Sequence, residues 1–73
     1  NETDQVEKDR NLNKALAMLD ESDRELLVLN RFQGLKYEEI ATLFKCSQGA
    51  IKVKAHRAIN QLRDYYFMIE KNQ

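Results

Sequence analysis

The sequence contains no proline and no tryptophan, only two glycines, and a single cysteine and a single histidine among its 73 residues. The lack of proline and the scarcity of glycine disfavour a turn-rich β fold and favour helices. One cysteine excludes an internal disulfide, and we expect Cys46 to be a small buried hydrophobe rather than a reactive thiol. No apolar run approaches the length of a membrane span, so we expect none.

An enzyme is the least favoured class of protein. One cysteine and one histidine cannot supply the four ligands of a zinc finger, and no glycine-rich phosphate loop is present. The adjacent carboxylates of Glu38 and Glu39 would point about 100° apart on a helix, so they do not converge as an acid–base pair. We therefore expect no catalytic residue, no cofactor and no metal ligand.

Acidic residues are missing from a long stretch of the second half of the chain. The whole sequence is neutral, with 12 basic and 12 acidic residues. Between Glu39 and Asp64 there is no acidic side chain, yet several basic ones fall in that interval: Lys45, Lys52, Lys54, Arg57 and Arg63. A surface built from this segment is cationic whatever the net charge of the chain, which favours nucleic acid as a partner.

The hydrophobic pattern predicts four helices. Ser22 and Glu25 match a capping box, Gly34 matches a helix stop, and Ser47 matches the cap of a last helix. The helices are expected roughly over residues 5–19, from 22 to the stop at 34, over 37–44, and from 48 to about 69. We therefore predict an all-α, four-helix domain containing a helix-turn-helix, of the winged-helix-like DNA-binding type without a wing, over residues 11–73. Residues 1–10 are expected to be a linker or a frayed start of the first helix.

The second predicted helix is apolar around most of its circumference, through Leu26, Leu27, Val28, Leu29 and Phe32. Such a helix is either central to a core or shared with a partner. We expect a partner surface made by Leu27, Val28 and Phe32, with Leu27 or Val28 as the exposed residue. A protein-interaction bundle that uses this surface and binds no nucleic acid is an alternative to a DNA-binding domain.

The last predicted helix has two different faces. At 100° per residue, one arc is apolar and is expected to face the core: Ile51, Ala55, Ala58, Leu62 and Ile69. The opposite arc carries no acidic side chain: Gly49, Lys52, Val53, His56, Arg57, Asn60 and Arg63. Ordinary solvated faces mix both signs of charge, and Val53 has no core to join, so it suits a thymine methyl group in the major groove. A short helix, a turn and a long cationic helix thus predict a DNA-reading helix-turn-helix.

Spacing divides the cationic face into reading and positioning residues. Four residues, each three or four positions from another, can follow one groove and are expected to contact bases: Lys52, Val53, His56 and Arg57. Lys54 and Arg63 lie off the centre of the arc or farther along the helix, where DNA phosphate is the expected target.

Four ordered segments also carry a family resemblance: G-L-K-Y-E-E-I-A (34–41), S-Q-G-A-I-K-V-K (47–54), H-R-A (56–58) and L-R (62–63). With this spacing they resemble region four, the C-terminal DNA-binding region, of bacterial RNA polymerase sigma factors, and the extracytoplasmic-function group most of all. The resemblance implies sequence-specific binding of the minus-thirty-five promoter element, as part of a sigma factor that directs RNA polymerase to initiate transcription. It implies as partners double-stranded promoter DNA, the β flap of core RNA polymerase and often an anti-sigma protein. It also implies that this protein acts in the cytoplasm.

The resemblance also implies roles for particular residues. It supports base contacts by the four reading residues, and it implies a set near the DNA backbone that we complete with the cations above: Lys36, Tyr37, Ser47, Gln48, Gly49, Lys54 and Arg63. Lys36 departs from the serine or threonine that usually caps this helix in the family. Lys45 stands where helix-turn-helix proteins often place glycine, so we expect a left-handed backbone there. The output domain of a two-component-type regulator is the alternative within DNA binding, because it shares the E-I-A segment (39–41).

Overall fold

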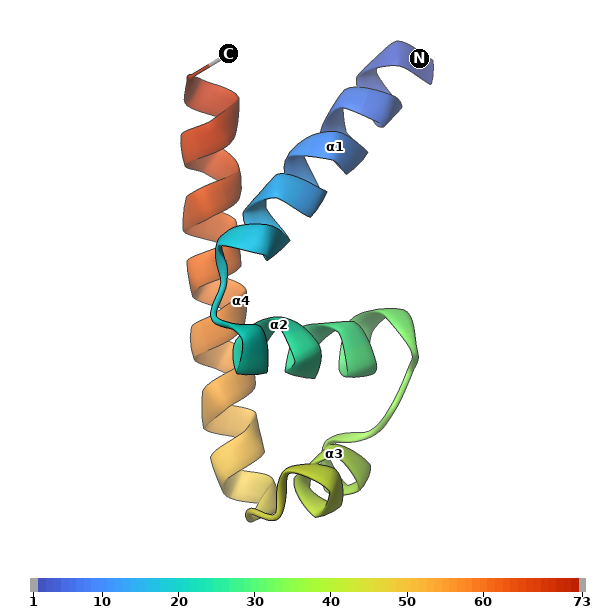
Figure 1. Cartoon of the computed structure of the whole chain (residues 1–73), viewed down its shortest axis with the longest axis vertical. Coiled ribbons are helices and arrows are strands. Elements are labelled where there is room, and N and C mark those ends of the chain that lie inside the picture. Colours follow the sequence, from blue (N-terminus) through green and yellow to red (C-terminus); the bar gives the residue numbers. More distant parts are fainter. Residues whose placement is uncertain (1, 73) are drawn as a thin grey trace.

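Helices form every regular element in the part of the chain that the computed structural model describes, which is residues 2–72, with side chains for residues 5–72. They are α1 (Glu2–Met18), α2 (Glu21–Leu27), the π-helical turn η1 (Val28–Phe32) that continues α2, α3 (Tyr37–Phe44) and α4 (Gln48–Lys71). The third and fourth helices, joined by a tight turn, form a helix-turn-helix (Figure 1). The predicted all-α fold with four helices is confirmed.

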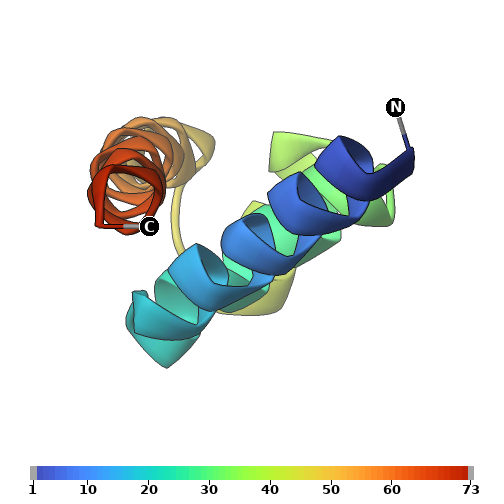
Figure 2. The ribbon, with the colours of Figure 1, turned by 90° about the horizontal axis from the view of Figure 1, so that it is seen from above.

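The longest helix sets the shape of the molecule. At about 1.5 Å per residue, the 24 residues of α4 account for most of the 39 Å longest dimension. The third helix lies at the amino end of α4, α2 and η1 cross near its middle, and α1 lies beside its carboxyl half (Figure 1). The first and last helices diverge toward the chain termini, as the view from above also shows (Figure 2).

Two buried clusters follow one another along α4. The first joins α2, α3 and α4 through Leu26, Ile40, Ala41, Ile51 and Ala55. The second joins α1, α2 and α4 through Leu16, Leu19, Leu27 and Ala58. The predicted core face of α4 is confirmed at Ile51, Ala55 and Ala58, which are fully buried, whereas Leu62 and Ile69 are half-buried because α1 has begun to diverge.

The second helix contributes to both clusters, and this corrects one prediction. Leu26 faces the helix-turn-helix cluster, and its neighbour Leu27 faces the cluster around α1, where it is only 1% exposed. Because α2 lies between α1 and α3, successive residues of this helix point into different cores. The prediction that Leu27 belongs to a partner surface is therefore wrong, and Val28, half-buried, and Phe32, exposed, are what remains of that surface.

The start of α2 also differs from the prediction. Asp20 is the N-cap residue, two positions before Ser22, so the predicted Ser22–Glu25 capping box does not form. The joint is held instead by Arg24, whose guanidinium donates to the carbonyl oxygens of Leu16, Ala17 and Leu19 at 3.5, 3.4 and 3.1 Å. Leu16 and Ala17 belong to the last turn of α1, where carbonyls lack the usual helical N–H four residues on, and Leu19 follows that helix. The Leu16 carbonyl also accepts from the Leu19 N–H at 3.2 Å, so Arg24 adds to this end of α1 and ties it to α2.

The first helix begins at Glu2, before its predicted start near Gln5. Residues that were expected to form a linker or a frayed start are helical here, and every side chain from residue 5 to residue 10 is exposed. Burial begins only at Asn11, so a domain boundary near residue 11 stays a prediction.

Gly34 ends the second helix as predicted, with a positive φ of 76°. After it, the Leu35 N–H donates to the Leu29 carbonyl and the Asn30 side-chain amide donates to the Leu35 carbonyl, both at 2.9 Å. These bonds fold the loop back on η1. They thereby place Tyr37, the first residue of α3, on the same side of the molecule as η1.

The turn of the helix-turn-helix is built on Lys45, which has the predicted left-handed backbone at φ 57° and ψ 47°. The Cys46 N–H donates to the Ala41 carbonyl at 3.0 Å and the Lys45 N–H to the Thr42 carbonyl at 3.3 Å, which is the Schellman arrangement. Cys46 is exposed, so the expectation of a buried thiol is wrong. It lies in a tight turn where residues 45–50 are all exposed, beyond the reach of the core.

Candidate nucleic-acid interface

The arc of α4 opposite the core is exposed over its whole cationic length. Lys52, His56, Arg57, Asn60 and Arg63 all face solvent, and Val53 among them is 59% exposed. The four residues predicted to read bases therefore share one accessible surface. An exposed valine surrounded by cations is the combination that suits a major groove, where the valine can meet a thymine methyl and the cations can meet acceptors or phosphates.

Local capping orders the amino end of this surface. The Ser47 side-chain oxygen accepts from the Ala50 N–H at 3.1 Å, which confirms Ser47 as the cap of α4. Ser47, Gln48 and Gly49 are exposed here, as their predicted role near the DNA backbone requires. The first turn of α4 carries no acidic residue, so the positive end of the helix dipole is not neutralised locally.

The start of α3 lies beside this surface. The Glu39 carboxylate accepts from the Lys36 N–H at 2.9 Å, which is one half of a capping box. The other half cannot form, because a lysine ammonium only donates hydrogen bonds. The Lys36 side chain is exposed and Tyr37 is half-buried, so both remain accessible on the side where a DNA backbone is expected.

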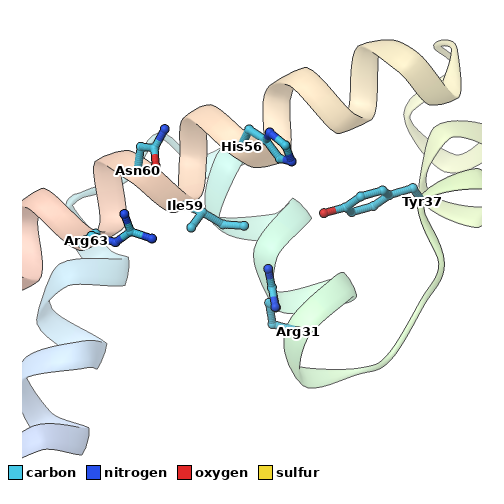
Figure 3. Close-up of a pocket in the computed structure, with 6 residues that line it drawn as sticks. All are labelled: Arg31, Tyr37, His56, Ile59, Asn60 and Arg63. Atoms are coloured by element: carbon cyan, nitrogen blue, oxygen red, sulfur yellow. The ribbon is translucent and has the colours of Figure 1, made fainter.

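One flank of α4 forms a cationic hollow with η1 and α3. Its volume is about 270 Å³, and it is lined by Arg31, Tyr37, His56, Ile59, Asn60 and Arg63. Tyr37 directs its hydroxyl toward α4, and Arg31 rises from η1 into the space between them (Figure 3). Among the described residues the lining includes two arginines and no carboxylate, so this flank attracts anions.

The other flank of α4 is acidic. A second hollow there is lined by Asp20, Asp23, Arg57, Asn60, Gln61 and Asp64. Arg57 thus shares its surroundings with three carboxylates, whereas Arg63 shares its own with a second arginine. The wheel placed both arginines on one cationic arc, but the neighbours that α2 and η1 supply give them opposite electrostatic environments.

Lys54 has a contact that the sequence did not reveal. Its ammonium lies 2.9 Å from a carboxylate oxygen of Asp23, and the two side chains are 29% and 17% exposed. This ion pair connects α4 to α2 beneath the exposed arc. The predicted phosphate contact of Lys54 would have to compete with it.

Sequence reasoning missed two residues of this interface. Arg31 belongs to a segment whose sequence was interpreted only through its apolar residues, so it was given no role. In the structure it lies on η1 and lines the hollow beside α4. Asn60 was placed on the cationic arc but was assigned no role, although it lines both hollows. The helical wheel already placed Asn60 on the exposed arc, so its accessibility was predictable. The position of Arg31 was not predictable, because it depends on how η1 packs against α4.

Groups of three or more histidine, cysteine, aspartate or glutamate residues that could hold a metal ion do not occur in the described part of the chain. No helix within residues 2–72 is long and apolar enough to cross a membrane.

The fold and this surface define a helix-turn-helix DNA-binding domain. The sequence model of one family, described as Sigma-70, region 4, matches residues 9–62. The chain therefore belongs to the sigma-70 region 4 family, and the resemblance drawn from its motifs is confirmed. This family membership favours a sigma factor over the output domain of a response regulator.

Curated relatives place the chain near the extracytoplasmic-function (ECF) group. It is 48% identical over 50 residues to the ECF RNA polymerase sigma factor ShbA of Streptomyces griseus, a match that covers 68% of this chain and 26% of the relative. It is 40% identical over 55 residues to the RNA polymerase sigma factor CarQ of Myxococcus xanthus, covering 75% and 32%. It is 38% identical over 53 residues to the ECF RNA polymerase sigma factor SigD of Mycobacterium tuberculosis, covering 73% and 25%.

The chain thus matches only a quarter to a third of the length of these relatives. No solved structure matches the chain significantly.

Proposed function

We propose that this domain binds the minus-thirty-five promoter element through α4, as the DNA-binding region four of a sigma factor that directs RNA polymerase to initiate transcription. The observation that carries the proposal is the exposed arc of α4, where Val53 lies among cations and no carboxylate belongs to the arc itself. Family membership supports the same role, because the relatives are named as RNA polymerase sigma factors.

Within this proposal the exposed residues of α4 divide the work. Lys52 and Arg57 donate to guanine O6 and N7, Val53 contacts a thymine methyl, and the His56 ring donates a hydrogen bond to a base acceptor. The exposed or half-buried residues at the starts of α3 and α4 hold the helix in register on phosphates without reading sequence. They are Lys36, Tyr37, Ser47, Gln48 and Gly49. Arg57 is the sharpest assignment, since the carboxylates around it disfavour a phosphate beside it.

A second surface serves the polymerase itself. Phe32 is 61% exposed on η1, and the half-buried Val28 belongs to the same turn. We propose that this surface contacts the β flap of core RNA polymerase or is covered by an anti-sigma protein. Action with the polymerase would place the protein in the cytoplasm.

The decisive experiment is a comparison of base discrimination. Selection from a random duplex library defines the preferred site, and competition with every single-base variant of that site is then measured for the wild type and for Arg57→Ala. We expect Arg57→Ala to cost about 1–3 kcal/mol on the preferred site and to relax discrimination at one base pair. Lys71→Ala, an exposed cation in the last turn of α4, is the matched control and should leave discrimination unchanged.

Two outcomes would contradict the proposal. A wild-type chain without preference among duplexes would remove the reading function altogether. Equal weakening of all variants by Arg57→Ala would make Arg57 a phosphate contact, and the reading face would then be assigned wrongly.

A further inference from the structure

The cationic hollow lies on one flank of the reading face and shares residues with it. His56 and Asn60 belong both to the exposed arc of α4 and to the lining of the hollow. The volume of about 270 Å³ falls below the range of roughly 300–1,000 Å³ typical of small-molecule sites. It is ample for a phosphate group that arrives attached to a larger molecule.

We propose that this hollow receives a backbone phosphate of the bound duplex, with Arg31 and Arg63 as its cations and the Tyr37 hydroxyl as a further donor. The proposal rests on the proposed function, because it needs α4 in the major groove. An arginine fork matches phosphate oxygens with two parallel hydrogen bonds, and a tyrosine hydroxyl donates one more. Arg31 thereby becomes a DNA-binding residue contributed by η1, outside the helix-turn-helix itself.

The acidic flank of α4 also supports a phosphate on the Arg31 flank, because its carboxylates repel the DNA backbone. Asp20, Asp23 and Asp64 line the hollow on that side of α4, and carboxylates close to phosphates raise the free energy of binding. The two flanks therefore differ in sign across a single helix. Because Asp23 is paired with Lys54, the repulsion on the acidic flank comes mainly from Asp20 and Asp64. A duplex that follows this field presents one backbone strand to the Arg31 flank and keeps its other strand away from these two aspartates.

Two other occupants of the cationic hollow have to be distinguished from a duplex phosphate. One is free inorganic phosphate, and the other is an acidic segment of a protein. The duplex is favoured because the hollow continues the DNA-facing arc without a break. Free phosphate would bind the hollow without any dependence on α4 entering a groove, and a protein partner would leave duplex affinity independent of Arg31.

The test measures how duplex affinity depends on salt. Wild-type chain making about three to five phosphate contacts should show a log–log slope of roughly −3 to −5. Arg31→Gln should reduce the magnitude of this slope by about 0.9, and the double variant Arg31→Gln/Arg63→Gln by about 1.8, with all sequences weakened alike. Arg31→Lys should retain the slope, and Arg10→Gln, an exposed arginine on α1, should leave it unchanged.

The outcomes separate this proposal from the proposed function. If Arg31→Gln keeps the wild-type slope while the wild type still reads sequence, the phosphate site is refuted and the reading face stands. The phosphate site is refuted in the same way if the His56 ring resonance shifts saturably in inorganic phosphate while Arg31→Gln leaves duplex binding unchanged. A wild type that binds no duplex at all would instead remove the proposed function.

Discussion

Replacing Lys54 with alanine tests whether this cation belongs to the fold or to the DNA interface. Its ammonium is 2.9 Å from the Asp23 carboxylate, and both side chains lie mostly out of solvent, at 29% and 17% exposure. Fully exposed pairs contribute about 0.2–1 kcal/mol to stability. A pair this shielded should reach the upper end, about 1 kcal/mol, because less water and salt screen it.

The assay is a double-mutant cycle in urea. Free energies of unfolding are measured for the wild type, Lys54→Ala, Asp23→Ala and the double variant, and the coupling energy is taken from their differences. We expect a coupling of about 1 kcal/mol. Loss of this amount lowers the melting temperature by about 4–8 °C in a domain of this size. Lys52→Ala, an exposed lysine on the same helix, should change stability by less than about 0.5 kcal/mol.

Salt gives the second readout of the same variants. Because the pair is electrostatic, its coupling should shrink at about 1 M salt, where the screening length falls to roughly 3 Å. Duplex binding by Lys54→Ala should keep the wild-type salt slope, since Asp23 already neutralises this ammonium. A coupling near zero together with a slope reduced by about 0.9 would refute this reasoning and restore Lys54 as a phosphate contact.

Two further variants test the cap of α4 and the partner surface. Ser47→Ala removes the acceptor for the Ala50 N–H and should lower the free energy of unfolding in urea by about 1 kcal/mol. Ser22→Ala is the control and should be nearly neutral, because Asp20, not Ser22, is the N-cap of α2. Equal losses of stability in the two variants would contradict this assignment of the caps. Phe32→Ala should weaken binding to purified core RNA polymerase without changing duplex affinity, because it adds no charge beside Arg31. The control is Leu43→Ala, since Leu43 is 60% exposed and Phe32 61%. Loss of polymerase binding in both variants alike would rule out a specific role for Phe32.

Local signals predicted the helix-turn-helix well. The bounds of α3 and the cap of α4 were predicted correctly, because a capping serine and hydrophobic spacing act over a single turn of helix. The left-handed Lys45 was predicted from its place in the turn rather than from its residue type. Tolerating a side chain there costs about 1–2 kcal/mol, and the two Schellman hydrogen bonds offset part of that strain.

The errors arose where packing over a distance decides the outcome. The capping-box pattern predicted that α2 begins at Ser22, but its N-cap is Asp20. Arg24 ties this end of α2 to the end of α1. Leu27 is buried because α1 covers the side of α2 on which Leu27 lies. A prediction that assumes one core leaves that side exposed to solvent. Neither effect can be read from the periodicity of one helix, since each depends on which element lies next to it.

The same dependence governs how the cations of α4 should be interpreted. A helical wheel places Arg57 and Arg63 on the same cationic arc and predicts the same electrostatic environment for both, because it considers the residues of one helix alone. In the folded chain, α2 and the residue before it bring carboxylates to the Arg57 flank, and η1 brings a second arginine to the Arg63 flank. Of the two arginines, Arg63 should therefore contact phosphate, and Arg57 should read a base because the carboxylates near it repel the backbone. If the proposed function holds, the direction in which a duplex lies across this domain depends on the helices packed behind α4 as much as on α4 itself.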